Sequence, residues 1–103
     1  MSSPINYRLE LTESAENDLE AILNYTALQW GEQQVDIYLA VIEKALQMIQ
    51  DNPDLGLTKY GVSGQLKGYK AGKHIIFYRL EDKTIYVVRI LHGSMNYPTY
   101  LDA

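Results

Sequence analysis

Cysteine is absent from the 103-residue sequence, which excludes disulfides, thiolate nucleophiles and thiolate zinc sites together. Long apolar runs are absent as well: the longest are short segments such as 75–78, whereas a membrane span needs roughly 20 apolar residues. Internal repeats and low-complexity segments are also missing. We therefore expect a single domain over residues 1–103, held together by side-chain packing alone and without a membrane partner.

Basic residues are scarce in the first half of the chain. Up to Gly56 there are ten acidic residues, with only Arg8 and Lys44 to oppose them, whereas the chain from Leu57 onward has seven basic and three acidic residues. This split indicates either that the basic half meets an anionic partner, such as nucleic acid or an acidic protein segment, or that the two halves neutralise each other in the fold.

The segment 1–4 has neither the basic nor the apolar part of a signal peptide. Taken with the lack of cysteine and of a membrane span, this favours a cytoplasmic protein.

The first half predicts one strand and two helices. Apolar and polar residues alternate over 6–11, which is typical of a half-buried strand. Thr12 stands where a helix N-cap is expected, and apolar residues then recur every three or four positions until Gly31, which suits a left-handed helix end. A second apolar stripe runs from Glu32 to Asn52–Pro53, where the proline ends it. One glycine between two long helices predicts an antiparallel helical hairpin.

The second half predicts three strands. Glycines mark 54–64 as a loop, and the strands 66–70, 73–80 and 84–91 follow with short turns between them. Both faces of the last two strands are apolar, so we expect the hairpin to cover them and the first strand to pair in the same sheet. The predicted fold class is α+β in the order β-α-α-β-β-β, a helical hairpin packed on a small twisted antiparallel sheet. Residues 1–5 and 96–103 are expected to be loosely ordered.

Few residues are arranged for catalysis or metal binding. The glycines of the second half are scattered and open no helix, so a phosphate-binding loop is not indicated. His74 and His92, the only histidines, fall on different predicted strands with no carboxylate at ligand spacing. We interpret both as structural or surface residues, and we expect no metal and no cofactor.

Cations and tyrosines gather on and beside the predicted sheet. Such a surface could bind phosphates and stack bases, and a well-placed histidine could then cleave RNA without a metal. The alternative is a strand face that its lysines keep soluble, and direct nucleic-acid binding stays open. The residues are Lys67, Lys70, Lys73, His74, Arg79, Arg89 and His92, with Tyr60, Tyr69, Tyr78 and Tyr86.

Large apolar side chains border the stripes of both predicted helices. A two-layer protein of this size cannot cover every side of its sheet, so these side chains either line an open groove that docks a partner's helix or strand, or complete the core. They are Tyr25, Leu28, Trp30, Tyr38 and Val41.

With these residues in view, the sequence resembles the ParE toxins of the RelE/ParE superfamily, from bacterial toxin–antitoxin pairs. The resemblance extends from Tyr7 to about Met95, nearly the whole chain. The segments that carry it are Thr12–Leu19, Tyr25–Thr26, Gln29–Gly31, Asp51–Gly56, Gly72–Arg79 and Val88–His92, followed by Met95.

This resemblance implies a toxin that binds DNA gyrase, stalls it on broken DNA and blocks replication, with no chemistry of its own. It also implies a cognate antitoxin of the ParD-like or an analogous type, whose tail wraps around the helices and the sheet. We accordingly expect antitoxin contacts at Tyr25, Trp30, Tyr38, Lys70, Lys73, Arg79 and Arg89, and target contacts at His92, Met95 and Asn96.

Two other functions compete with this one. The first is a ribosome-dependent messenger RNA endonuclease of the RelE type. There Lys67, Lys70 or Arg79 would hold the phosphate and stabilise its developing charge, and His92 would protonate the leaving oxygen. The second is a diverged, inactive relative that is retained as an antitoxin-binding module.

Overall fold

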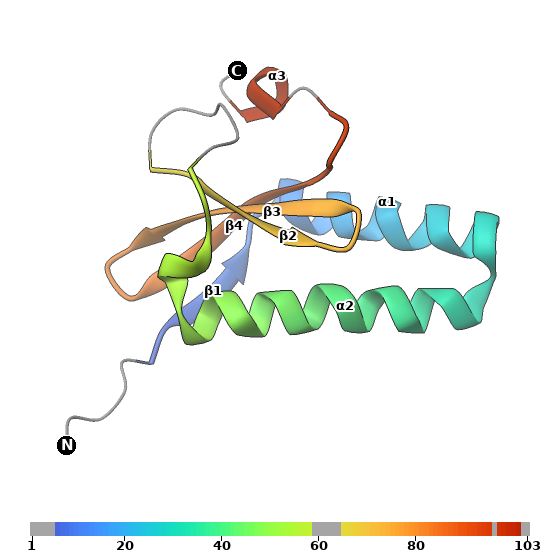
Figure 1. Cartoon of the computed structure of the whole chain (residues 1–103), viewed down its shortest axis with the longest axis horizontal. Coiled ribbons are helices and arrows are strands. Elements are labelled where there is room, and N and C mark those ends of the chain that lie inside the picture. Colours follow the sequence, from blue (N-terminus) through green and yellow to red (C-terminus); the bar gives the residue numbers. More distant parts are fainter. Residues whose placement is uncertain (1–5, 59–64, 96, 102–103) are drawn as a thin grey trace.

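A computed structural model describes residues 6–58, 65–95 and 97–101, in which a hairpin of two helices lies against one face of a twisted sheet (Figure 1). The predicted α+β class and element order are confirmed. In chain order the elements are β1 (Arg8–Leu11), α1 (Glu13–Trp30), α2 (Glu32–Asp51), the 3-10 turn η1 (Pro53–Leu55), β2 (Lys67–Ala71), β3 (His74–Glu81), β4 (Thr84–His92) and α3 (Tyr97–Leu101).

The sheet is mixed, in the order β1-β4-β3-β2, whereas the sequence predicted an antiparallel sheet. The pairs β2–β3 and β3–β4 are antiparallel, but β1 runs parallel to β4. The reason lies in the hairpin: α2 returns the chain to the start of β1, where the Gln50 side chain donates a hydrogen bond to the Tyr7 carbonyl (2.7 Å). β2 therefore runs in the direction of β1, and two reversals give β4 the same direction.

The helix junction follows the sequence signals. Thr12 caps α1, because its side-chain oxygen accepts the Ala15 N–H (3.2 Å). Gly31 has φ +89° and φ values of this kind favour glycine, so α1 ends there and α2 starts at the next residue. The predicted antiparallel hairpin is confirmed. Among the described helices, none is both long enough and apolar enough to span a membrane.

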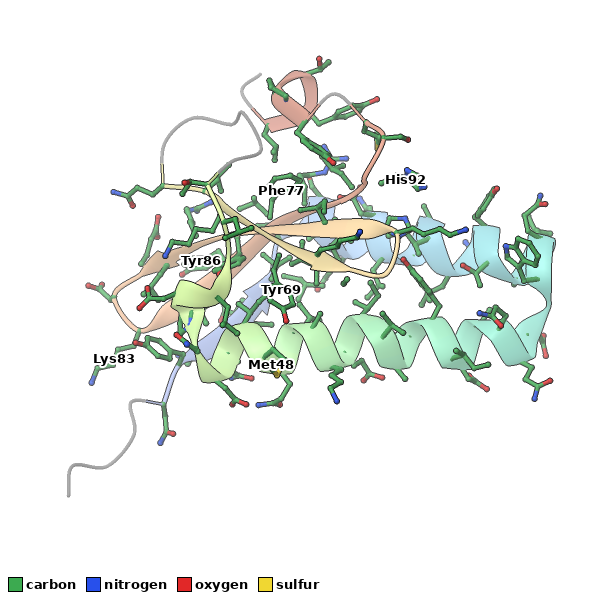
Figure 2. All side chains as sticks on the ribbon, in the orientation of Figure 1. Met48, Tyr69, Phe77, Lys83, Tyr86 and His92 are labelled. Carbon is green, nitrogen blue, oxygen red and sulfur yellow. The ribbon has the colours of Figure 1, made fainter. Side chains whose placement is uncertain are left out.

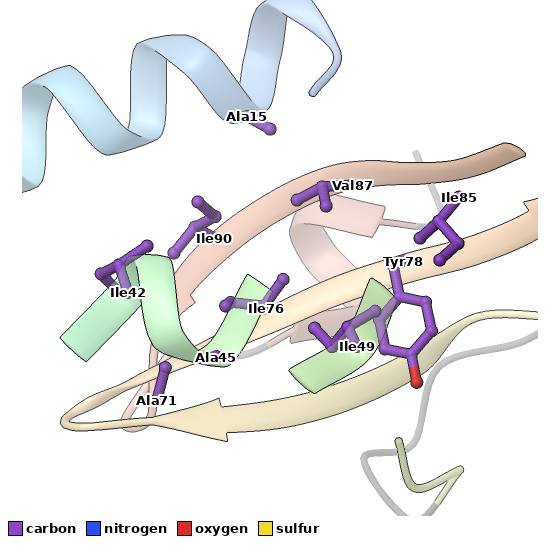
Figure 3. Packing of buried hydrophobic residues seen from close by; sticks show 10 residues of the cluster. All are labelled: Ala15, Ile42, Ala45, Ile49, Ala71, Ile76, Tyr78, Ile85, Val87 and Ile90. Atoms are coloured by element: carbon purple, nitrogen blue, oxygen red, sulfur yellow. The ribbon is translucent and has the colours of Figure 1, made fainter. Parts of the chain in front are cut away.

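The main core lies between the hairpin and the sheet (Figure 3). Ile42 and Ile49 of α2 meet Ile76 of β3 and Ile85 of β4, and all four are fully buried. Burial of each such side chain contributes about 1.5–3 kcal/mol to folding. Along β3 alternate residues face the hairpin. In β4 the register shifts opposite Phe77 and Tyr78, so the spacing of the hairpin-facing residues changes there, and Val87 and Ile90 both face the hairpin.

The face of the sheet away from the hairpin is covered by the C-terminal segment. Phe77 is completely buried there, and the ring of Tyr97 packs against it with ring centroids 5.0 Å apart. The sequence predicted that 96–103 is loosely ordered; for 97–101 this is wrong, because α3 covers Ile75, Phe77 and Leu91, which the hairpin cannot reach. Residues 1–5, 96, 102 and 103 lie outside the described residues.

Helix α1 is tied to the open edge of β4. β1 pairs with β4 only as far as Val87, and beyond it the Thr12 hydroxyl donates to the Val88 carbonyl (3.0 Å). One turn into α1, the Asp18 carboxylate accepts the Ile90 N–H (2.9 Å) and two hydrogen bonds from the Arg89 guanidinium (2.7 and 2.9 Å). A side chain thus takes the place of a neighbouring strand at this edge.

We predict that Asp18→Ala lowers the free energy of unfolding by about 2–4 kcal/mol, because Arg89 and the Ile90 N–H would be left half-buried without their acceptor. Urea unfolding at pH 7.5 measures the change. The control is Glu10→Ala, which removes an exposed ion pair with Arg8 (3.4 Å) and should cost at most about 0.5 kcal/mol. Equal losses in the two variants would contradict the role given to Asp18.

Candidate functional site

The helical hairpin projects beyond the end of the sheet at which the β2–β3 turn lies (Figure 1). A groove of about 780 Å³ opens between this projecting part and the sheet. Its lining combines an aromatic and aliphatic wall from the helices with polar groups from the strand ends, the combination found at ligand and partner sites. The lining residues are Ala21, Ile22, Tyr25, Thr26, Trp30, Gln34, Tyr38, Lys73, His74 and His92.

The helical wall of the groove is exposed to a degree unusual for aromatic residues. Tyr25 is 63% and Trp30 69% exposed, and both belong to the last turns of α1, at the end of the helix that projects beyond the sheet (Figure 1). Large exposed aromatic side chains beside a groove mark a place where another molecule can bury them. Of the five side chains for which the sequence left a groove or the core open, Tyr25, Trp30 and Tyr38 line the groove, and Tyr38 also packs against the core, whereas Leu28 and Val41 are exposed outside the groove lining.

The sheet end of the groove is formed by the two histidines. His74 begins β3 and His92 ends β4, and the antiparallel register places them directly opposite each other. Their rings meet edge to face with centroids 5.3 Å apart. Figure 2 shows His92 at the end of the sheet nearest the projecting helices, far from Lys83 in the β3–β4 turn.

Tyr38 of α2 locks the β2–β3 turn beside these rings. Its hydroxyl oxygen accepts the Lys73 N–H (3.0 Å). The hydroxyl is also placed to donate to the Ala71 carbonyl (3.3 Å) and is hydrogen-bonded to Nδ1 of His74. Gly72 turns the chain at φ +60°, and a Cβ at this position would stand 2.8 Å from the Tyr38 ring. A close approach of turn and helix therefore requires glycine here.

The described lining of the groove contains basic but no acidic side chains. The basic residues are Lys73, which is a permanent cation, and the two histidines. Burial lowers the pKa of His74, the neighbouring His92 lowers it further, and Asp18 partly offsets both effects. Burial also raises the pKa of the Tyr38 hydroxyl, so this group stays protonated near neutral pH.

The structure brings together about half of the residues expected to contact an antitoxin. Tyr25, Trp30, Tyr38 and Lys73 line one groove. The other three lie elsewhere, because side chains alternate between the two faces of a sheet. Lys70 pairs with Ile75 on the face away from the hairpin. Arg79 lies on that face as well, over the Tyr86 ring (5.2 Å) and paired with Glu81 (2.9 Å), and Arg89 is held by Asp18.

The residues of the alternative ribonuclease site are not brought together. Lys67 pairs with Tyr78, four residues along β3 from His74, which places it about 13 Å from the histidines. Lys70 and Arg79 are on the opposite face from His92. Lys67 is instead paired with Asp54 (3.3 Å). None of these three cations is among the residues that line the groove with His92.

The expected target contacts are divided between the groove and the far face. His92 is exposed at the groove, where its Nδ1 accepts the Ser94 N–H (3.1 Å). Met95 packs against the cluster under α3. Asn96 lies outside the described residues, as does Tyr60 of the cation and tyrosine set.

Sequence reasoning missed Gln34 and the pairing of the two histidines as parts of one site. The pairing had a signal: in an antiparallel hairpin the first residue of one strand faces the last residue of the next, and His74 and His92 hold these positions. No sequence signal pointed to Gln34, because it is one of several polar residues at the start of α2. Within the described residues, no group of three or more His, Asp or Glu side chains is placed to hold a metal ion.

Over the described residues, this small α+β fold presents an open groove with an aromatic helical wall and polar strand ends, a surface suited to binding another molecule. The comparison with known families agrees. Residues 9–97 match the family model described as the ParE toxin of the type II toxin–antitoxin system parDE, and the chain belongs to this family. It is therefore the toxin component of such a system.

Relatives of similar length support this assignment. The chain is 29% identical over 91 residues to Toxin ParE1 of Caulobacter vibrioides, covering 88% of this chain and 94% of that protein. It is 33% identical over 90 residues to Toxin ParE1 of Mycobacterium tuberculosis, covering 86% and 92%.

Two solved structures share the fold. The chromosomal ParDE toxin–antitoxin system from P. aeruginosa matches with a TM-score of 0.74 at 18% identity, covering 84% of this chain and 96% of that chain. The toxin–antitoxin complex RelBE2 from Mycobacterium tuberculosis matches with a TM-score of 0.61 at 20% identity, covering 85% and 99%.

We predict that His74 makes the free protein less stable in mild acid. Its pKa is lowered in the fold but is near 6.5 in the unfolded chain, so the unfolded chain binds the proton more readily. Stability is therefore full above about pH 6.5 and is lost as the pH falls toward the folded-state pKa. Urea midpoints between pH 7.5 and 5.5 should fall more for the wild type than for His74→Gln. Parallel pH profiles would refute the prediction.

Proposed function

We propose that this chain is a cytoplasmic toxin that acts by binding and is neutralised by a cognate antitoxin seated in the groove. The observation that carries the proposal is the groove itself, with the exposed Tyr25 and Trp30 on one wall and Lys73 on the other. Family membership supports it, and so do the names of the two matched structures, which are toxin–antitoxin systems.

The lining indicates what kind of segment fits the groove. Tyr25, Trp30 and Ile22 offer apolar area along the helices, whereas Lys73 and the histidines offer donors and positive charge at the sheet end. An amphipathic segment with apolar side chains toward the helices and acidic groups toward the strands complements both parts. Such a segment can be disordered before it binds and become ordered in the groove.

The target that we propose is DNA gyrase, on the ground of family membership. The residues that we propose for target contact remain His92, Met95 and Asn96. Antitoxin in the groove would cover His92 directly, because this ring is part of the lining. Neutralisation would then follow from occupation of a shared surface. The ribonuclease alternative finds no support in the placement of Lys67, Lys70 and Arg79.

For the groove, we predict that Trp30→Ala weakens binding of the antitoxin encoded beside this toxin by about 10- to 100-fold, as expected for an aromatic anchor. Isothermal titration calorimetry measures the dissociation constants. The matched control is Leu28→Ala on the same helix: Leu28 is 85% exposed but is outside the groove lining, and its loss should leave affinity within about twofold. Equal effects of both variants would remove the groove from the proposal.

For the target, we predict that the purified chain inhibits supercoiling by DNA gyrase or accumulates cleaved DNA, and that added antitoxin reverses the effect. A parallel incubation with ribosomes and messenger RNA should leave the messenger intact. Cleaved messenger with unaffected gyrase would overturn the target assignment in favour of the ribonuclease. No effect in either assay, together with tight antitoxin binding, would overturn it in favour of an inactive antitoxin-binding module.

A further inference from the structure

The sheet end of the groove brings one lysine and both histidines together in an acidic protein. The chain has a net charge of -4, yet Lys73, His74 and His92 meet at the groove with no acidic residue in its described lining. The histidine rings are 5.3 Å apart between centroids, so protonation of both would place two like charges next to Lys73. An anion bound among the three would remove this repulsion.

We propose that Lys73, His74 and His92 form a proton-linked carboxylate site, at which the partner's acidic group binds together with a proton taken up by His74. This inference rests on the proposed function, because the carboxylate belongs to the antitoxin segment in the groove. An Asp or Glu side chain and the C-terminal carboxylate of that segment present the same chemistry to the site.

The hydrogen bonds around His74 can accommodate the extra proton. In the neutral tautomer whose Nδ1 carries no proton, the Tyr38 hydroxyl donates to Nδ1 of His74. In the imidazolium state Nδ1–H becomes a donor, and the Tyr38 hydroxyl can rotate to donate to the Ala71 carbonyl while its oxygen accepts from Nδ1–H. No polar group loses its partner in the exchange, because the Lys73 N–H is accepted by the same oxygen in both states.

The groups that face His74 come from four elements. They are Tyr38 on α2, Lys73 in the turn, His92 on β4 and, at longer range, Asp18 on α1. Asp18 is the one acid among them, and its two oxygens are already occupied by Arg89 and the Ile90 N–H. A partner's carboxylate is therefore the anion still needed to stabilise the imidazolium form.

The sign of the linkage follows from these charges. In the free protein His74 resists protonation because burial and the adjacent ring lower its pKa. A carboxylate held at the site favours the charged form and raises that pKa, so the complex binds more protons than the separate molecules. Affinity then rises as the pH falls, by up to about tenfold per pH unit for each coupled proton.

The test measures the dissociation constant of the antitoxin encoded beside this toxin at pH 7.5, 6.5 and 5.5 by calorimetry, in two buffers of different ionisation enthalpy. For the wild type we expect about a tenfold or greater gain in affinity over this range, with net proton uptake. The double variant His74→Gln, His92→Gln should lose the pH dependence and the proton uptake. Lys73→Gln should weaken binding at every pH and keep the slope.

The matched control is Lys83→Gln, which removes a cation at the opposite end of the sheet and should change neither affinity nor slope (Figure 2). Urea midpoints show whether each variant is folded, and wild-type proton uptake tests the site even if the double variant does not fold. To identify the source of the carboxylate, the antitoxin is prepared with an amidated C-terminus or with its acidic side chains changed to amides. The modification that abolishes the pH dependence identifies the carboxylate that binds at the site.

A wild-type affinity that is constant from pH 7.5 to 5.5 without proton uptake would overturn the carboxylate site. So would a pH dependence that persists in the folded double variant. In both cases the proposed function would stand if Trp30→Ala still weakens binding. If Trp30→Ala and the wild type bind alike, the groove is not the antitoxin site, and the proposed function fails together with this inference.

Discussion

The attachment of α1 to the unpaired edge of β4 is the constraint on which the rest of the structure depends. β1 is too short to pair with the whole of β4, so the last part of that central strand would otherwise expose its backbone. Asp18 accepts the Ile90 N–H there and holds Arg89 at the same time. This contact attaches α1 to the sheet before the helix continues toward the projecting end of the hairpin, where the groove lies.

The groove divides its chemistry between the two layers of the fold. The helices supply aromatic area that a partner can bury, and the strand ends supply charge and hydrogen-bond donors. Tyr38 connects the helical layer with the sheet, because it belongs to α2 and its hydroxyl is hydrogen-bonded to the β2–β3 turn. Any segment that occupies the groove therefore contacts both layers, which favours binding of the folded toxin over a loosened form.

Much of the fold follows from local sequence signals. The Thr12 cap, the break at Gly31 and the proline after α2 each act within a few residues, so the two helices could be predicted with their bounds. The parallel direction of β1 could not, because it depends on the hairpin returning the chain to its starting edge. The sequence also did not predict that 97–101 forms the helix α3, and the reason is similar. A five-residue helix has little stability of its own and depends on packing against Phe77 and Leu91.

The candidate site was predictable only in part. Tyr25, Trp30 and Tyr38 stand out as apolar residues at the edges of helical stripes, and this signal indicated either an open groove or completion of the core without deciding between them. The cations were grouped by sequence composition, whereas the pleat of the sheet places Lys70 and Arg79 on the face away from the hairpin, and Lys73 lies in the β2–β3 turn at the groove. The ion pair of Arg89 with Asp18 could not be predicted, because Asp18 lies 71 positions earlier in the chain.

The placement of β1 beside β4 has a consequence during protein synthesis. Thr12 and Val88, which meet at this edge, are 76 positions apart, so the first strand to leave the ribosome finds its neighbour only when the last strand has emerged. Until then the helices have no complete sheet to cover. A ribosome that stops before β4 consequently releases a fragment without the groove, and a harmful activity built on this fold is withheld until the chain is nearly finished.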